Sequence, residues 1–295
     1  MFKKALSIFL IFTLVFLFAS CGADKDSSES NNNSNVFNPD APTITQAADD
    51  ADKTADNGKY AKVTVPEGYT LLKTAWLLEE NGVCSTDDFI NAVSNYDTSK
   101  YSVLSSIHDR DKICFLLEGY LFPATYTFEK NSDPTKVIDK MVATEEKKFT
   151  AEMRQRATEL GYSVHDILTI ASIIEKEAFT DEQRTLISST IHNRLKQNMK
   201  LEYDVTVNYC TGVIQLKYPD KIDYYKYYYN GNRCKGLIAG PICNPGIASI
   251  KAALYPADTD YLFFVIDTNP PYNSAFTNSY EEHLKNVQKW KNGEL

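Results

Sequence analysis

The alternation of apolar and polar positions predicts that order begins near Tyr60. Residues 60–65, "YAKVTV", alternate as a half-buried strand does, and the "PEG" that follows predicts a turn. Apolar residues then recur with helical spacing through "TLLKTAWLLEE". A second helix is expected to begin at Ser85 or Thr86, because either side chain can cap it and two aspartates occupy its first turn. The pattern therefore predicts a small α/β unit over residues 60–112.

Helical spacing dominates the next part of the chain. The aromatic run "FLLEGYLFPATYTF" alternates, which predicts an extended segment or a strand with a turn. Gly161 is expected to separate two of the helices that follow. The expected helices run from Asp133-Pro134 to about Phe149, from Ala151 to Leu160, from a cap at Ser163 through "ASIIEKEAF", and from Thr180 or Asp181 through "HNRLKQ".

The C-terminal third of the chain is less regular. Residues 201–256 are rich in Tyr, Asn, Gly and Pro, which predicts long ordered loops around short helices. "SIKAALYP" predicts a short helix that ends before Pro256, "DYLFFVID" a buried strand, and "SYEEHLKNVQKWKNGEL" a closing amphipathic helix. Together the segments predict an α+β fold in two parts, of which the second spans residues 113–295.

The first 59 residues predict export and tethering. Residues 1–21 combine a basic start, an apolar run and small residues, as a secretory signal peptide does, and "FAS" before Cys21 resembles a bacterial lipobox. Cleavage there would leave a lipid anchor on Cys21 at the extracytoplasmic face of the cell membrane. The alternative is an uncleaved membrane helix, for which the run is short. Residues 22–59 are polar and acidic, which predicts a disordered linker.

Charge and cysteine content narrow the possible partners. The net charge is −8 and no basic run follows the first few residues, so nucleic acid is not an expected partner. The 19 tyrosines fit a polysaccharide surface, although tyrosines also line cores. The cysteines after Cys21 are odd in number and lack a C-x-x-C spacing, so no metal site is expected. Cys234 and Cys243 flank a Gly/Pro-rich loop and are candidates for a disulfide, with free or buried thiols as the alternative.

The run "ASIIEKEAF" places two carboxylates in an apolar segment. On a helical wheel Glu175 and Glu177 fall at roughly 80° on either side of Ile167, within the apolar arc. A buried carboxylate must be paired, hydrogen-bonded or protonated. One interpretation is a structural ion pair, with Arg184 or Arg194 as the partner. The other is a general acid whose pKa is raised by burial, and the wheel does not choose between the two glutamates.

Several stretches resemble one known family. "ASIIEKEA", "ISSTIHNRLKQNMKLEYDVTVNY", "GLIAGPICNPGIASIKAALYPADTDYLFFV" and "FTNSYEEHLKNV" follow "VPEGYTL" and "LEGYLFPATY" in that order. They resemble the YceG-like family, the MltG-type endolytic murein transglycosylases, from about Val63 to the C-terminus. The resemblance implies a LysM-like module over residues 60–112 and, over 113–295, a catalytic domain with a lysozyme-like cleft for peptidoglycan glycan strands. Cell-wall synthases or division proteins are implied as further partners.

The resemblance also implies roles for individual residues. Glu177 stands at the family's catalytic glutamate, which protonates the glycosidic oxygen after N-acetylmuramic acid and then deprotonates the C6 hydroxyl that closes a 1,6-anhydro ring. One carboxylate is then enough, and neither a metal nor a cofactor is implied. Asn193 and Arg194, in "HNRL", also match the family pattern. The alternative to a role at the site is structural: a helix-face hydrogen bond for Asn193 and an ion pair for Arg194. The implied substrate-binding residues are Glu202, Asp204, Thr206, Tyr229 and Asn230, and the implied supporting residues are Glu175, Asn193, Gly240 and Pro241.

Departures from the family pattern leave more than one function open. Glu202 replaces a Gln, and Ile238-Ala239 replace paired prolines. The first hypothesis is an active lytic transglycosylase, which the retained Glu177 and Asp204 favour. The second is a catalytically weakened murein-binding or cell-wall-synthesis scaffold protein of the same fold, which the altered loop favours. The third is a hydrolase that uses water, for which Glu202 or Asp204 would supply the second carboxylate.

Overall fold

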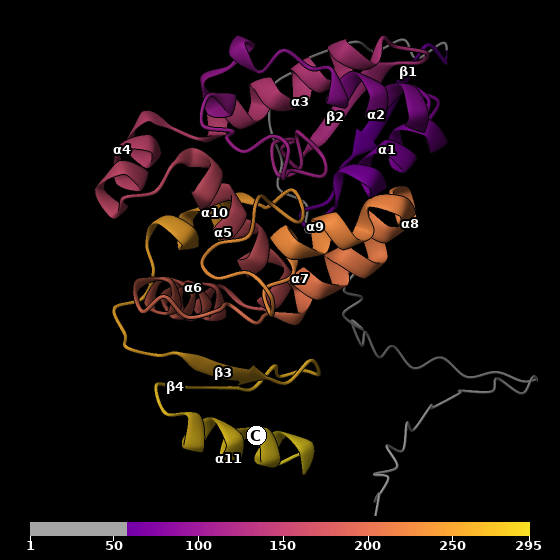
Figure 1. Cartoon of the computed structure of the whole chain (residues 1–295). Helices are drawn as coiled ribbons and strands as arrows, with labels where there is room; N and C mark the ends of the chain where they lie inside the picture. The colour runs from indigo at the N-terminus through magenta and orange to yellow at the C-terminus, as the bar shows by residue number, and fades with distance from the viewer. Residues whose placement is uncertain (1–57) are drawn as a thin grey trace, which may run out of the picture. The chain divides into compact units, whose positions relative to one another are not determined.

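The computed structural model describes residues 58–295. The expected signal peptide, the lipid-modified Cys21 and the linker up to residue 57 lie outside the described residues. The described chain mixes many helices with a few short strands, which confirms the predicted α+β class (Figure 1). Among residues 58–295 no helix has the length and apolar character that crossing a membrane requires.

The first sheet joins segments that are far apart in sequence. Strand β1 (Tyr60–Thr64) pairs antiparallel with β2 (Thr125–Glu129), so that Tyr60 lies opposite Glu129. Ala61 and Val63 face the core, as the alternating pattern predicts. The two strands come from either side of the expected boundary at residues 112 and 113. Their pairing fastens the two expected parts together, and the boundary itself stays a prediction.

Helices α1 (Leu71–Glu80), α2 (Thr86–Ser94) and α3 (Pro134–Lys148) lie beside this sheet at the top of Figure 1. Ser85 caps α2 and Asp133 caps α3, as expected. The start of α1 has a second acceptor, because Glu118 Oε1 accepts the Leu71 amide at 2.7 Å. Burial raises the pKa of Glu118 to about 8, and its hydrogen bonds only partly oppose this effect. Two short helices, η1 (Thr98–Lys100) and η2 (Ser102–Leu104), complete this part.

Helix α5 (Val164–Glu177) carries the "ASIIEKE" run and is buried along most of its length. It begins with a reciprocal capping box between Ser163 and Asp166. The preceding helix α4 (Ala151–Leu160) ends at Gly161, whose φ of 79° suits glycine. Helices α6 (Asp181–Lys196) and α10 (Ile247–Leu254) pack against α5.

The C-terminal elements are a β-hairpin and the last helix. Strand β3 (Phe263–Ile266) pairs antiparallel with β4 (Ser274–Thr277), and α11 (Tyr280–Lys291) packs on this hairpin (Figure 1). Strand β3 was expected to be buried, but its residues are only partly buried, because a two-stranded sheet leaves much of each strand uncovered. The segments between α6 and α10 are α7 (Asp204–Tyr209), a π-helical turn η3 (Cys210–Ile214), α8 (Gln215–Lys217), η4 (Pro219–Lys221) and α9 (Ile222–Tyr229).

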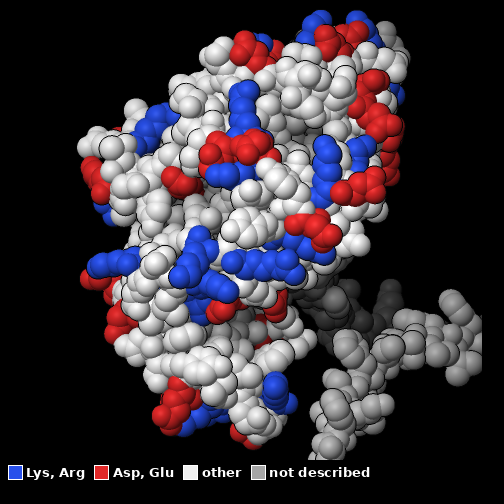
Figure 2. Space-filling model, viewed as in Figure 1, with Lys and Arg blue, Asp and Glu red and all other residues white. Residues whose placement is uncertain are grey.

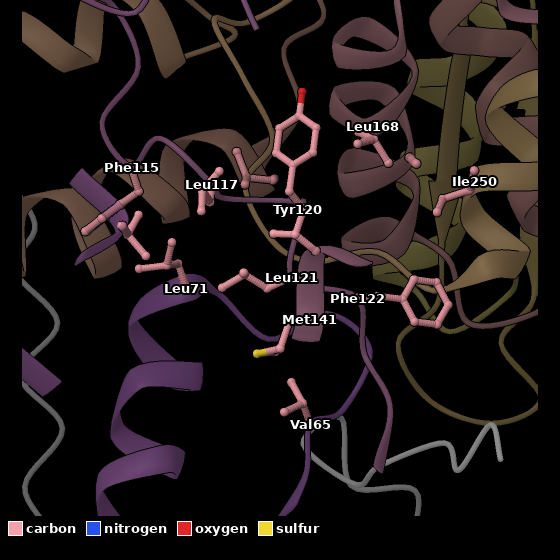
Figure 3. Packing of buried hydrophobic residues seen from close by; sticks show 14 of the residues in the cluster. Val65, Leu71, Phe115, Leu117, Tyr120, Leu121, Phe122, Met141, Leu168 and Ile250 are labelled. Atoms are coloured by element: carbon pink, nitrogen blue, oxygen red, sulfur yellow. The ribbon is translucent and has the colours of Figure 1, made fainter. Parts of the chain in front are cut away.

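One hydrophobic core runs through the described chain. Figure 3 shows side chains of the loop before β2 packed near Leu71 of α1, Met141 of α3 and Leu168 of α5; those labelled are Phe115, Leu117, Tyr120, Leu121 and Phe122. Each fully buried side chain of this size contributes about 1.5–3 kcal/mol to the free energy of folding. The loop over residues 113–124 is therefore a packed part of the core.

The cysteines do not pair. All five cysteines in the described residues are free thiols. The Cys234 thiol lies 3.1 Å from the Asn230 carbonyl oxygen, and that of Cys243 lies 3.4 Å from the carbonyl of Ser172. The candidate disulfide between Cys234 and Cys243 is therefore not formed, and the alternative of free or buried thiols is the correct one.

Candidate active site

A cavity of about 280 Å³ opens where α5 ends and α7 begins. Strand β3 and helix α11 complete its wall. It brings together Glu177, Glu202 and Asp204, three of the residues that the sequence singled out. The lining consists of Glu177, Arg194, Glu202, Tyr203, Asp204, Phe264 and His283.

Glu177 is the last residue of α5, and its side chain is only partly exposed. Burial raises the pKa of its carboxyl to about 7, the negative charge of Asp204 adds to this shift, and a hydrogen bond with the Val205 backbone opposes it. Near neutral pH the carboxyl therefore exists in both forms. A group in this state can give up a proton and take one back, which is the requirement for an acid–base catalyst.

Arg194 of α6 holds the chain on both sides of the cavity. Its Nε donates to the Leu262 carbonyl at 2.6 Å. Its Nη1 donates to the carbonyls of Leu201 at 2.6 Å and Lys200 at 3.2 Å. Nη1 also lies 3.8 Å from the Glu202 carboxylate, a loose ion pair whose acidic partner is exposed. Arg194 thus joins the segment before α7 to the one before β3.

Aromatic rings form much of the remaining wall. Tyr203 stacks on Phe264 with ring centres 5.6 Å apart, and Phe263 stacks on His283 at 5.4 Å. The Arg194 guanidinium lies over the rings of Phe263 at 5.1 Å and Tyr203 at 5.7 Å. Burial lowers the pKa of His283, and the charge of Arg194 lowers it further, so this imidazole is neutral near pH 7.

Glu175 contacts a different part of the molecule. Its Oε2 accepts the Gly246 amide at 3.1 Å and the Ser249 hydroxyl at 2.6 Å. These groups belong to the start of α10, whose glycine cap has no side chain of its own. Glu175 therefore substitutes for the missing cap of α10, and its supporting role in catalysis stays a prediction.

Asn193 also makes structural contacts. Its side-chain amide donates to the carbonyls of Thr259 at 2.8 Å and Tyr261 at 3.0 Å, which fixes the segment that leads into β3. The helix-face hydrogen bond that was the alternative for Asn193 is also present, because Nδ2 lies 3.4 Å from the Ser189 hydroxyl one turn back on α6. Arg194, for which an ion pair was the alternative, makes that pair only loosely.

Thr206, Tyr229 and Asn230 do not line the cavity. Thr206 is fully buried, donates to the Tyr203 carbonyl at 2.7 Å and accepts the Gly231 amide at 3.0 Å. The hydroxyl of Tyr229, also fully buried, accepts the Cys114 amide at 3.3 Å, and Asn230 shapes the turn after α9. These contacts position the cavity wall, and direct sugar binding by these residues stays a prediction.

Gly240 and Pro241 are buried where two loops cross. A Cβ at Gly240 would lie 3.2 Å from the Tyr229 hydroxyl. Pro241 packs so closely on Gly119, whose φ is 86°, that a Cβ there would lie 2.4 Å from the proline ring. The "GLIAGP" loop is thus held by the core.

Sequence reasoning missed three lining residues: Tyr203, Phe264 and His283. Tyr203 stands between two of the singled-out acids in "LEYDVT", and that position was its only signal. Phe264 and His283 belong to segments interpreted as a buried strand and an amphipathic helix, since hydrophobic patterns do not show which cavity a side chain reaches.

Side chains that bind metals do not gather at one place in the described part of the chain. No group of three or more His, Cys, Asp or Glu side chains there could hold a metal ion. The polar residues of the cavity are instead three carboxyl groups, one guanidinium, one phenol and one imidazole.

Known proteins are similar to this chain in sequence and in fold. An endolytic murein transglycosylase from Bacillus subtilis (strain 168) is 38% identical over 246 residues, 79% of this chain and 66% of that protein. A protein of the same name from Streptococcus pneumoniae serotype 2 is 31% identical over 256 residues, 80% of this chain and 45% of its own length. The chain thus spans less than two thirds of the length of either relative.

A solved structure is also similar to this chain. The crystal structure of a putative yceG-like protein from Listeria monocytogenes matches with a TM-score of 0.64 and 34% identity, over 76% of this chain and 75% of that one. The sequence model of the YceG-like family matches residues 41–289. The chain therefore belongs to the YceG-like family.

Proposed function

We propose that the chain is an endolytic lytic transglycosylase. It cleaves the bond between N-acetylmuramic acid and N-acetylglucosamine within peptidoglycan strands and leaves 1,6-anhydro-N-acetylmuramic acid ends. The observation that carries the proposal is the carboxyl of Glu177 in the cavity, with its pKa raised to about 7. The names of the relatives support murein as the substrate.

In the first step Glu177 acts as an acid. Its carboxyl gives a proton to the glycosidic oxygen, the bond from that oxygen to C1 of N-acetylmuramic acid breaks, and positive charge develops at C1. The negative charges of Asp204 and Glu202 face the same cavity and stabilise this charge. Arg194 offsets part of their effect, but its guanidinium already binds backbone carbonyls.

In the second step Glu177 acts as a base. Its carboxylate takes the proton of the C6 hydroxyl of the same sugar, and the oxygen attacks C1 and closes the anhydro ring. The carboxyl is protonated again, so the cycle consumes no water. A pKa close to the working pH suits a group that must both give and take a proton.

The placement of the protein is proposed on the sequence and the family. Residues 60–112 act as a LysM-like module, residues 113–295 as the catalytic domain, and a lipid on Cys21 holds both at the extracytoplasmic face of the membrane. Cell-wall synthases or division proteins are the proposed neighbours. Over the face drawn in Figure 2, acidic and basic side chains are interspersed, so this face is not the uniformly basic surface that binding to a nucleic acid would favour.

The test is product analysis by mass spectrometry. The full chain in detergent is incubated with peptidoglycan lacking stem peptides, beside the variants Glu177→Gln and Glu182→Gln. Glu182 is exposed on α6, so its variant controls for the loss of one negative charge. Anhydro ends from the wild type and the control, and none from Glu177→Gln, support the proposal.

Two other outcomes would overturn the proposal. Reducing ends would indicate a hydrolase in which water replaces the C6 hydroxyl. Binding of glycan without cleavage by the wild type would indicate the scaffold hypothesis.

A further inference from the structure

Tyr203 has a hydroxyl group that the folded protein does not use. The side chain is 6% exposed, and within residues 58–295 no atom forms a hydrogen bond with its Oη. A buried hydroxyl without a partner is unfavourable, so such a group in a functional cavity calls for an explanation. One explanation is a partner that forms in another state of the site.

The ring of Tyr203 is held firmly. It stacks on Phe264 and lies beneath the Arg194 guanidinium. Its backbone carbonyl accepts hydrogen bonds from the Thr206 hydroxyl at 2.7 Å and the Thr206 amide at 3.1 Å. Any new hydrogen bond to Oη must therefore come from movement of the partner.

Glu177 is the group near Tyr203 whose protonation state, and therefore whose capacity to accept hydrogen bonds, changes during the proposed reaction. Both residues line the cavity, and the carboxylate charge acts on the Tyr203 phenol. Burial raises the pKa of that phenol, although Arg194 opposes the shift, so Oη keeps its proton as a donor. The Val205 backbone already bonds the Glu177 carboxyl, which leaves room for a further donor once the proton is lost.

The other charged groups around Glu177 do not supply that donor. Asp204 and Glu202 are acceptors when ionised. The Nε and Nη1 atoms of Arg194 donate to carbonyl oxygens, and Nη1 also lies near the Glu202 carboxylate. His283 is neutral and stacked on Phe263, and its buried Nδ1 also has no hydrogen-bond partner among the described residues. The Glu177 charge acts on the Tyr203 phenol. The charge that acts on His283 is instead that of Arg194, so we favour the phenol as the donor.

We propose that Tyr203 is a positioning residue whose hydroxyl donates a hydrogen bond to the Glu177 carboxylate after Glu177 has given up its proton. The proposal rests on the proposed function, in which that carboxylate is the base of the second step. The hydrogen bond stabilises the carboxylate and holds it in place for the C6 hydroxyl. The structure has this donor without a partner among the described residues, and the proposal assigns its partner to the charged state of Glu177.

The test titrates Glu177 without substrate. The carboxyl carbon is followed by NMR in the full chain in detergent, for the wild type, Tyr203→Phe and Tyr227→Phe. Loss of a hydrogen bond to a charged group should move the titration midpoint of Glu177 up by about one pH unit in Tyr203→Phe. Tyr227 is 66% exposed on α9, so its variant should leave the midpoint unchanged.

Stability and turnover give two further readings. Because Oη has no partner in the folded protein, Tyr203→Phe should unfold at the same or a higher temperature than the wild type. A clear fall in that temperature would assign the hydroxyl to structure and overturn the proposal. The rate of anhydro-end formation should fall roughly tenfold, and its high-pH limb should move upward with the midpoint.

The outcomes distinguish a failure of the Tyr203 proposal from a failure of the proposed transglycosylase function. An unchanged midpoint overturns the role of Tyr203 even if the wild type makes anhydro ends. A moved midpoint in a protein that cleaves no glycan keeps the pairing of the two groups and overturns the proposed function, and with it the role of the pairing in catalysis.

Discussion

The carboxylate of Glu175 accepts a 2.6 Å hydrogen bond from the Ser249 hydroxyl, at the start of α10. Glu177, two residues further along α5, faces the cavity instead. This difference separates two glutamates that a helical wheel treats alike. We expect Glu175→Ala to lower the free energy of unfolding by about 1–3 kcal/mol, because two buried donors lose their acceptor. Urea unfolding measures this loss.

The isosteric change is the matched control for that prediction. Glu175→Gln keeps an oxygen that can accept both hydrogen bonds, so most of the stability should remain. Neither variant should move the pH midpoint of the rate. A midpoint that follows the charge at residue 175 would mean that Glu175 tunes Glu177.

The rate of glycan cleavage should fall as the pH rises through about 7. The pKa of Glu177 is raised mainly by burial and also by Asp204, and only the protonated carboxyl can start the reaction. In Asp204→Asn the repulsion between the two charges is gone, so the midpoint should move to lower pH, whatever happens to the maximal rate. The measurement is kcat/KM against pH. Asp220→Asn, an exposed change on η4, should keep the wild-type midpoint.

Glu145 should make the fold sensitive to pH. Its side chain is fully buried on α3, and no described residue forms a hydrogen bond with either carboxyl oxygen. Burial raises its pKa to about 8, with Arg154 opposing, from 4.5 in an exposed carboxyl. The folded state therefore holds the proton more tightly than the unfolded state, and stability falls as the pH rises from about 4.5 toward 8.

Glu145→Gln tests this effect, because the amide has a similar shape and does not ionise. Unfolding temperatures of the wild type and the variant should diverge with increasing pH, in favour of the variant. Parallel curves at pH 5 and pH 8 would show that Glu145 is not the group responsible.

Local signals were sufficient to predict most helices. Ser85 and Ser163 cap the helices that the sequence assigned to them, and Gly161 ends α4 in the left-handed conformation. These signals act within one turn of the chain. The state of Cys234 and Cys243, which the sequence left open, and the overestimated burial of β3 have the opposite origin. Both depend on which distant segment packs against the residue.

The same limit applies to the site. The family resemblance pointed to Glu177 and Asp204, which line the cavity. It also implied substrate binding by Thr206 and Tyr229, which stays a prediction. Both are fully buried behind the cavity wall. His283 of α11 reaches the cavity only because the β3–β4 hairpin carries that helix there. Such contacts between residues far apart in sequence have no local pattern.

Asn244 should contribute strongly to the stability of the fold, because its hydrogen bonds join segments that are far apart in sequence. It is fully buried, and its Oδ1 accepts the amides of Gly119 and Leu121 at 3.0 and 3.1 Å. Its Nδ2 donates to the Tyr69 carbonyl at 3.0 Å. We expect Asn244→Ala to lower the free energy of unfolding by about 2–4 kcal/mol, since several buried groups lose partners together. Asn244→Asp keeps the acceptor but loses the amide donor, so its free energy of unfolding should lie between those of the wild type and Asn244→Ala. A loss below about 1 kcal/mol in Asn244→Ala would show that water replaces the side chain.

Arg194→Lys should separate charge from geometry at the cavity. Lysine keeps the positive charge, but one ammonium group cannot reach the carbonyls of Leu201 and Leu262 at the same time, as the guanidinium does. The segments before α7 and before β3 should then shift, and kcat/KM should fall by about 10–100-fold, the equivalent of one or two lost hydrogen bonds to a charged group. Arg233→Lys, an exposed change, should leave the rate unchanged. Full activity in Arg194→Lys would mean that only the charge matters, and the loose ion pair with Glu202 would then be the more important contact of this residue.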